Sequence, residues 1–158
     1  MDNSFVKALL SQPHLPSPVF CYADATVETI AKKVCACLNE AGGWIVVGVN
    51  ADHHSVAIDA PTFANNVQKE ITEGILPLPL VYVQQDVFED RAVVLITIPK
   101  GSLTPYTYRA RYYVLQGEEP AVATNDYLAR LLRDSSAMQS EEIIRSILRL
   151  QRNIAGRQ

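Results

Sequence analysis

The sequence predicts an α+β fold in which a mixed β-sheet is flanked by helices and followed by a C-terminal helix. Apolar residues recur at three-to-four spacing in some segments, whereas they alternate or run continuously in others. Short turns join some of the strand-like segments and helices join the rest, so hairpins and helical crossovers both occur. With 158 residues, 48% hydrophobic and 20% charged, the chain fits one packed domain with a small appendage. We expect a domain over residues 1–134 and a linker with a helix over 135–158.

The first third of the chain is expected to lead into a buried central strand. The predicted elements are a short helix within residues 1–11, a strand at 19–23, a helix at 27–41 and a strand at 44–49. Three prolines at positions 13, 16 and 18 disfavour any helix after residue 12. Asp24 or Thr26 is suited to cap the longer helix, and Gly42-Gly43 to end it. The run WIVVGV is almost wholly apolar, which is typical of a strand buried on both faces.

The remainder of the chain alternates turn residues with strand and helix patterns. The predicted elements are first a turn at 50–55, a short returning strand at 56–58, and a helix that is opened by Pro61 and reaches Gly74. A hairpin follows, with strands at 80–88 and 92–98 around Glu89-Asp90-Arg91, and then a single strand at 106–116. The last predicted elements are a helix capped by Thr124 or Asn125 and running through Leu132, a linker at 135–140, and a final helix capped by Ser140.

Charge and cysteine usage narrow the function classes. The net charge is −3, so bulk attraction to nucleic acid or to an anionic membrane is absent. Residues 1–108 hold 6 basic and 11 acidic side chains, whereas residues 109–158 hold 8 and 6, so a polyanion would favour the second part. No apolar stretch is long enough to span a bilayer, and the first ten residues lack a secretory-signal pattern. Three cysteines, an odd number, indicate reduced thiols and a cytoplasmic protein.

Residue patterns for catalysis, metals or cofactors are weak. Asp52-His53-His54 contains possible metal ligands, but adjacent histidines tend to point apart and a turn explains the run better. Cys35 and Cys37 lie about 200° apart around a helix, so they are expected to fill the core. Gly42-Gly43 follows a helix and precedes a strand, the reverse of a phosphate-binding loop. We therefore expect no catalytic residue, no metal and no cofactor.

The segment KGSLTPYTYRARYY, residues 100–113, is the strongest candidate for a binding surface. In one continuous strand, Arg109, Arg111 and Tyr113 would share a face, with Lys100 preceding it. Guanidinium groups contact phosphates and aromatic rings stack on bases. These four residues are the predicted nucleic-acid-binding set, and the alternative is a solvated face whose arginine stems cover apolar surface.

The final predicted helix carries an apolar stripe that needs a partner. Packing of this helix on its own domain and self-association of two chains are both consistent with the spacing. The possible homodimer would form through Ile143, Ile147, Leu150 and Ile154.

Two ordered motifs resemble the Schlafen-type AlbA domain. The first is ACLNEAGGWIVVGVNADHHSVAI at residues 36–58, and the second is VVLITIPKGSLTPYTYRARYYVLQG at residues 93–117, within a resemblance that covers residues 15–133. The resemblance implies an AlbA-like αβ domain that binds DNA or RNA. The positions that carry the family's structural pattern are Asn39, Gly42, Gly43, Gly48, Pro105, Tyr106 and Gly117.

Departures from the family pattern decide between the activities that the resemblance implies. Residues 17–22 lack the acidic and lysine residues of the family's first strand, Asn50 stands where an Asp follows the second strand, and Gln116 replaces an Arg. The leading hypothesis is a non-enzymatic regulatory module, such as a transcriptional regulator, that binds nucleic acid weakly. The alternative is a protein-interaction or oligomerisation domain that has lost nucleic-acid binding. A metal-dependent nuclease using Asp52, or a nucleotide-binding protein, is less favoured.

Overall fold

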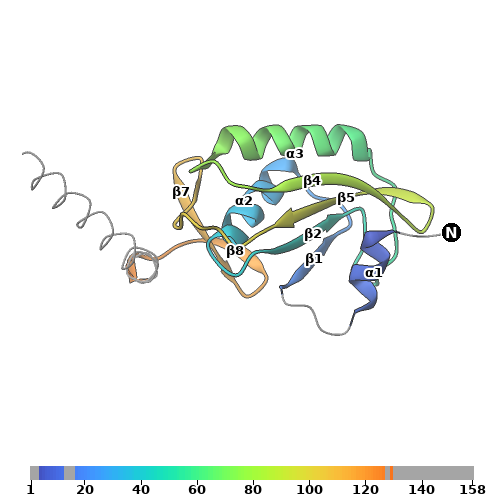
Figure 1. Ribbon diagram of the computed structural model, residues 1–158, viewed down its shortest axis with the longest axis horizontal. Coiled ribbons are helices and arrows are strands. Elements are labelled where there is room, and N and C mark those ends of the chain that lie inside the picture. Colours follow the sequence, from blue (N-terminus) through green and yellow to red (C-terminus); the bar gives the residue numbers. More distant parts are fainter. Residues whose placement is uncertain (1–3, 13–16, 127–128, 130–158) are drawn as a thin grey trace, which may run out of the picture.

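The computed structural model describes residues 4–12, 17–126 and 129, and within them the chain builds two sheets around a central helix (Figure 1). The larger sheet is mixed, with helices on both faces, so the predicted α+β class is confirmed. The elements are α1 (Phe5–Ser11), β1 (Val19–Tyr22), α2 (Val27–Leu38), β2 (Gly43–Val47), α3 (Ala60–Gly74), β3 (Ile75–Leu76), β4 (Tyr82–Phe88), β5 (Arg91–Ile98), β6 (Thr107–Tyr108), β7 (Arg111–Gln116) and β8 (Glu119–Val122).

The larger sheet has the strand order β1-β2-β5-β4. β1 runs parallel to β2, because α2 returns the chain to the same end of the sheet, and the other pairs are antiparallel. The predicted central strand is confirmed, since β2 lies between two partners. Ile45 and Val47 point into the core that contains α2 and α3, whereas Val46 points into the smaller core beneath α1.

Short polar side chains cap the N-termini of α1, α2 and α3. The Ser4 hydroxyl accepts a hydrogen bond from Lys7 N, Thr26 Oγ1 from Thr29 N, and the Asp59 carboxylate from Thr62 N. Of the two caps proposed for the second helix, the structure uses Thr26. Pro61 lies in the first turn of α3, as its missing N–H and fixed φ favour.

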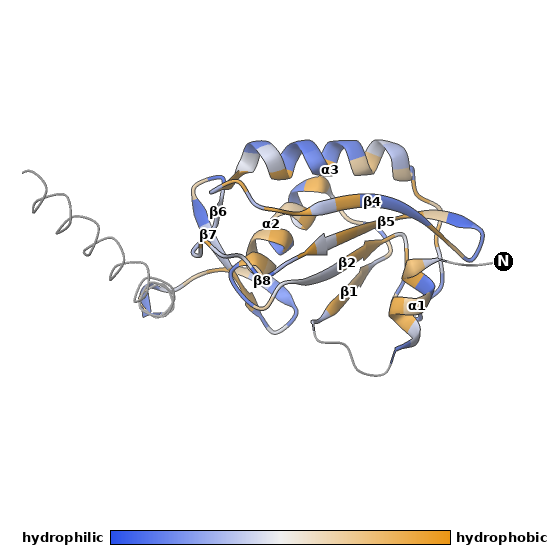
Figure 2. Ribbon diagram, in the orientation of Figure 1, coloured by the Kyte–Doolittle hydropathy of each residue, from blue (hydrophilic) through white to orange (hydrophobic). Residues whose placement is uncertain are grey.

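Helix α2 is enclosed by the two sheets. From Ile30 to Leu38 every residue except Lys32 is buried. One side packs on the larger sheet. The other receives Tyr108 and Tyr113 from the second sheet, whose order is β3-β6-β7-β8, and Tyr106, which directly precedes β6. In Figure 2 the apolar turns of α2 accordingly lie in the interior of the molecule. Cys35 and Cys37, predicted as core residues, are fully buried here.

Three sequence predictions about strands are wrong. Residues 106–116 form a hairpin rather than one strand, because Arg109 and Ala110 adopt φ values of 49° and 67° and reverse the chain. β8 was not predicted at all, since its four residues include Pro120. Residues 56–58 form no strand, and only a single bridge joins Val49 to Ser55.

The predicted C-terminal features lie outside the described residues. This holds for the linker at 135–140, the final helix and its stripe of Ile143, Ile147, Leu150 and Ile154. Of the preceding predicted helix, Asn125, Asp126 and Ala129 are described and are helical. None of the helices in the described part of the chain has the length and apolar character needed to cross a membrane.

Candidate functional site

The β6–β7 hairpin carries two of the predicted binding residues and buries a third. Residues opposite each other across a hairpin share a face, and here Tyr108 lies opposite Arg111. The turn therefore brings Tyr113 to the same side as Tyr108, with their ring centroids 6.2 Å apart. Tyr113 is only 7% exposed. Its predicted place on an exposed face was wrong, because the prediction assumed one continuous strand.

Arg109, at the tip of this hairpin, is bound to α3. Its Nη2 and Nε donate to Glu70 Oε1 at 2.7 and 3.0 Å, and its backbone N–H donates to the Gly74 carbonyl. The Tyr108 hydroxyl donates to the same Glu70 oxygen at 2.7 Å. These hydrogen bonds, from Tyr108 and then Arg109, lower the pKa of Glu70, while burial raises the pKa of Tyr108 to about 12. Part of the Arg109 charge is thereby neutralised within the protein.

Lys100 and Arg111 have no neighbouring carboxylate that offsets their charge in the described part of the chain. Both side chains are exposed, and neither has an ion-pair partner among the described residues. Lys100 follows β5 in the loop that leads to β6, and Arg111 begins β7 directly after the hairpin turn. Of the four predicted binding residues, these two are the most accessible to a phosphate group.

Asn39 fixes the position of the hairpin from below. Its amide Nδ2 donates to the carbonyls of Tyr106 and Tyr113 at 3.0 and 2.8 Å, and its Oδ1 accepts from Tyr106 N at 2.6 Å. Asn39 is 4% exposed and ends α2. One side chain thus satisfies three buried backbone groups, two on Tyr106 directly before β6 and one on Tyr113 in β7.

The glycines of the first motif allow close backbone approach. Gly42 has φ +76°, and a Cβ atom there would lie 2.4 Å from the Ile98 carbonyl oxygen. Gly43 begins β2 and Gly48 follows it, Gly117 lies in the β7–β8 turn, and Pro105 follows a cis peptide bond. Tyr106 is buried, and its hydroxyl accepts a hydrogen bond from Leu103 N. The family-pattern residues therefore serve the connections between elements.

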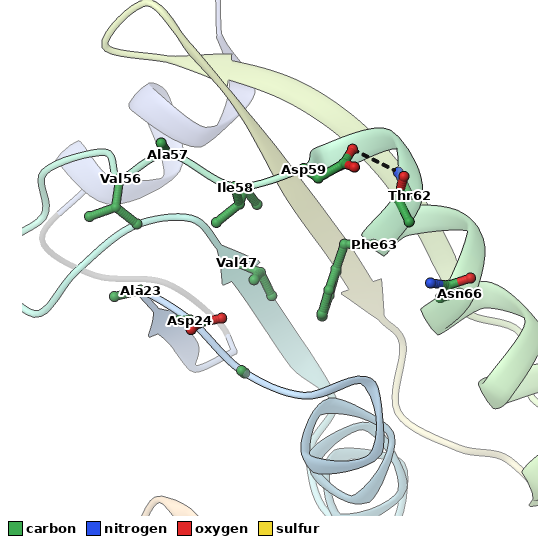
Figure 3. A pocket seen from close by; sticks show the side chains of 11 residues that line it. Ala23, Asp24, Val47, Val56, Ala57, Ile58, Asp59, Thr62, Phe63 and Asn66 are labelled. Atoms are coloured by element: carbon green, nitrogen blue, oxygen red, sulfur yellow. Dashed lines mark hydrogen bonds between the residues drawn. The ribbon is translucent and has the colours of Figure 1, made fainter.

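A cavity of about 460 Å³ opens where the parallel strands β1 and β2 end (Figure 3). Val47, Ile58 and Phe63 line its apolar part, and Asp24 and Asp59 lie at its edge. Its volume suits a small molecule. The two carboxylates disfavour a phosphate group there. The cavity is therefore not part of the predicted phosphate-binding surface on the β6–β7 hairpin. Sequence reasoning missed it, although both aspartates follow segments that were predicted to be strands.

The Asp52-His53-His54 run is a turn, as predicted. Asn50 Oδ1 accepts hydrogen bonds from Asp52 N and His54 N. Glu89 accepts from Ser55 N at 2.7 Å and lies 3.3 Å from His54 Nδ1, and these contacts lower the pKa of Glu89. Among the described residues, no group of three or more His, Cys, Asp or Glu side chains is placed to hold a metal ion.

Comparison with known proteins gives a family and a fold. A family model described as Schlafen, AlbA_2 matches residues 17–123. The N-terminal domain of a Nitrosomonas europaea protein, named for its relation to the ATP-dependent DNA helicase RecG, superposes with a TM-score of 0.52 at 12% identity, covering 76% of this chain and 88% of that one. The DIP2311 protein of Corynebacterium diphtheriae gives 0.49 at 15% identity, and the match covers 79% of this chain but only 22% of that protein's chain. No curated protein sequence matches this chain.

Proposed function

Because the chain belongs to the Schlafen AlbA_2 family, we propose that it is a cytoplasmic regulatory module that binds nucleic acid without catalysing a reaction on it. The observation that carries the proposal is the pair of free cations, Lys100 and Arg111, within the second family motif. The fold shared with a domain of a protein named for a DNA helicase supports a nucleic-acid ligand. Three free cysteines in the described residues support the cytoplasm as its location.

The binding that we propose is electrostatic and weak. Lys100, Arg109 and Arg111 supply the positive charge, and Glu70 offsets part of the Arg109 contribution. The chain as a whole is acidic, with a net charge of −3, so attraction depends on this local surface. Tyr113 is buried and has no part in stacking on a base. Each phosphate contact adds to the salt dependence of such an interface.

Fluorescence anisotropy with labelled single- and double-stranded DNA and RNA tests the proposal. We expect saturable binding that weakens between roughly 50 and 200 mM salt. The double variant Lys100→Ala/Arg111→Ala should weaken binding by about tenfold and flatten the salt dependence. The matched control is Lys7→Ala/Lys69→Ala, which removes two exposed lysines from α1 and α3. No binding at the lower salt concentration, or equal losses in both double variants, would overturn the proposal.

Self-association is a second candidate function, favoured by an exposed apolar row. Leu76, Leu78, Leu80 and Tyr82 are each between 56% and 68% exposed where β3 leads into β4. Both strands lie at the edges of their sheets, so a second copy of the chain has apolar side chains and strand edges to contact. Light scattering on Leu78→Ser/Leu80→Ser measures this directly. A dimer that becomes a monomer supports the candidate, and an unchanged mass rejects it.

A further inference from the structure

Two adjacent lysines of α2 have opposite environments. The Lys32 side chain is 34% exposed, and its Nζ lies 3.3 Å from Glu28 Oε1. Lys33 is only 1% exposed, although lysine is rarely buried without a partner. No described carboxylate lies within ion-pair distance of Lys33. Burial lowers its pKa, which is the expected response of an ammonium group removed from water.

The aromatic rings of β1 compensate part of the Lys33 charge. Its Nζ lies 3.6 Å from the centroid of the Phe20 ring and 5.9 Å from that of Tyr22. Such contacts attract the cation, but they accept no conventional hydrogen bond from its three N–H groups. In the described part of the chain no fully buried side-chain nitrogen lacks a partner, so the N–H groups of Lys33 face the cavity that it borders and are available to a ligand or to water there.

Lys33 lines a cavity of about 340 Å³ along the open edge of β1. In the described residues β1 pairs only with β2, so its other edge borders the cavity. The cavity is also lined from the second sheet, by Glu118 in the β7–β8 turn and Glu119 at the start of β8. One buried cation and two exposed carboxylates thus border a space of the size that holds a small molecule.

We propose that this cavity binds a small zwitterion of the amino-acid class, whose carboxylate contacts Lys33 and whose ammonium group contacts Glu118 or Glu119. A carboxylate is the acceptor that the Lys33 ammonium lacks. A phosphate group fits less well, because the two glutamates would repel a dianion at the entrance. The same glutamates attract the cationic end of a zwitterion. The site is separate from Lys100 and Arg111 and does not depend on nucleic-acid binding.

Three probes of equal chain length separate the contributions of the two ends: 4-aminobutyrate, butyrate and n-butylammonium. In a two-dimensional ¹⁵N NMR titration, we expect 4-aminobutyrate to shift the amides of β1, α2 and the β7–β8 turn, with a Kd on the order of 1 mM. Butyrate should bind several-fold more weakly, and n-butylammonium should shift these amides least. Equal shifts from all three probes, or no shifts near Lys33, would overturn the proposal.

Variants of Lys33, Glu118 and Glu119 test which side chains contact the carboxylate end and which contact the ammonium end of the ligand. Lys33→Met keeps the aliphatic stem and should weaken 4-aminobutyrate and butyrate by at least about tenfold, whereas the matched control Lys32→Met should bind both as the wild type does. Glu118→Gln/Glu119→Gln changes only exposed side chains, so it tests the site even if Lys33→Met does not fold. It should abolish the preference for 4-aminobutyrate over butyrate. A preference that persists in this variant would contradict the assignment of the glutamates.

Discussion

The two hairpins β4–β5 and β6–β7 use similar turns but are held in place differently. Each reverses through two non-glycine residues with positive φ, Glu89-Asp90 in one and Arg109-Ala110 in the other. β4 and β5 pair over seven residues, and β5 contributes to both cores. β6 and β7 pair over two residues.

This difference in length explains why polar anchors matter more in the second hairpin. The long hairpin is positioned by its own ladder and by buried side chains such as Leu95 and Ile96. The short one depends on Asn39 and Glu70, which reach it from α2 and α3. The short strands β6 and β7 are therefore positioned by a few specific hydrogen bonds. Single substitutions of the residues that make these bonds should lower the stability of the protein measurably.

Of the substitutions that test this difference between the hairpins, replacing Asn39 should lower the free energy of unfolding most. Asn39→Ala removes the acceptor of the Tyr106 N–H and the amide donor to the Tyr106 and Tyr113 carbonyls, of which the Tyr106 carbonyl keeps only the weak donor Cys35 Sγ. We expect a loss of about 3 kcal/mol in the free energy of unfolding. Urea denaturation measures it. The control Asn65→Ala, at an exposed position of α3, should change stability by less than about 0.5 kcal/mol. A loss below about 1 kcal/mol for Asn39→Ala would mean that the hairpin is placed by its apolar contacts instead.

Glu70→Gln should have the next largest effect. It removes the charge that accepts from Arg109 and Tyr108, and the Arg109 side chain is 54% exposed, so we expect a loss of only about 1 kcal/mol. Glu89→Gln is the equivalent change at the other hairpin. Because Glu89 is exposed and its hairpin has a long ladder, thermal unfolding should show a smaller decrease in Tm for it. Equal decreases would remove the distinction between the two hairpins.

Glycine at the turns should stabilise both hairpins slightly. Ala110 is exposed and has φ 67°. Ala110→Gly should therefore relieve backbone strain by more than it costs in added conformational entropy of the unfolded chain, for a net gain of about 0.5 kcal/mol. Asp90→Gly, with φ 63° in the other turn, is expected to behave alike. Chemical denaturation of the two variants, compared with Ala51→Gly in an exposed turn, checks the result. Destabilisation by Ala110→Gly would show that the added conformational entropy of the unfolded chain outweighs the strain relieved in the folded turn.

Acidification should weaken the second hairpin through Glu70. The hydrogen bonds from Tyr108 and Arg109 place the folded-state pKa of Glu70 below its ordinary value of 4.5. The stabilisation is therefore present above pH 4.5 and is lost as the pH falls through the folded-state pKa. The Tm difference between the wild type and Glu70→Gln should shrink over this acidic range. A difference that stays constant down to about pH 3 would assign the stabilisation to shape rather than charge.

Sequence periodicity predicted the elements whose stability comes from apolar burial. The helices α1, α2 and α3, the central strand β2 and the β4–β5 hairpin all carry the expected patterns. The β6–β7 turn was missed because Arg109-Ala110 has no turn signature and interrupts no alternation. Its conformation is imposed by Glu70 and Gly74, which are distant in sequence.

The candidate sites were predicted less completely than the fold. Lys100 and Arg111 lie exposed as expected, but Tyr113 is buried, since a reversal in the chain changes which residues share a face. The environment of Lys33 could not be foreseen, because a lysine in a helix usually faces solvent. Only the second sheet, which covers the far side of α2, makes that position an interior one.

The enclosure of α2 makes the two sheets one cooperative unit. The second sheet has no interior of its own, because its buried tyrosines belong to the cluster that surrounds this helix. Neither sheet can separate without exposing the helix on that side to water, which couples local opening to the loss of the whole core. Backbone amides from Ile30 to Leu38 should therefore exchange with solvent only when the entire domain unfolds.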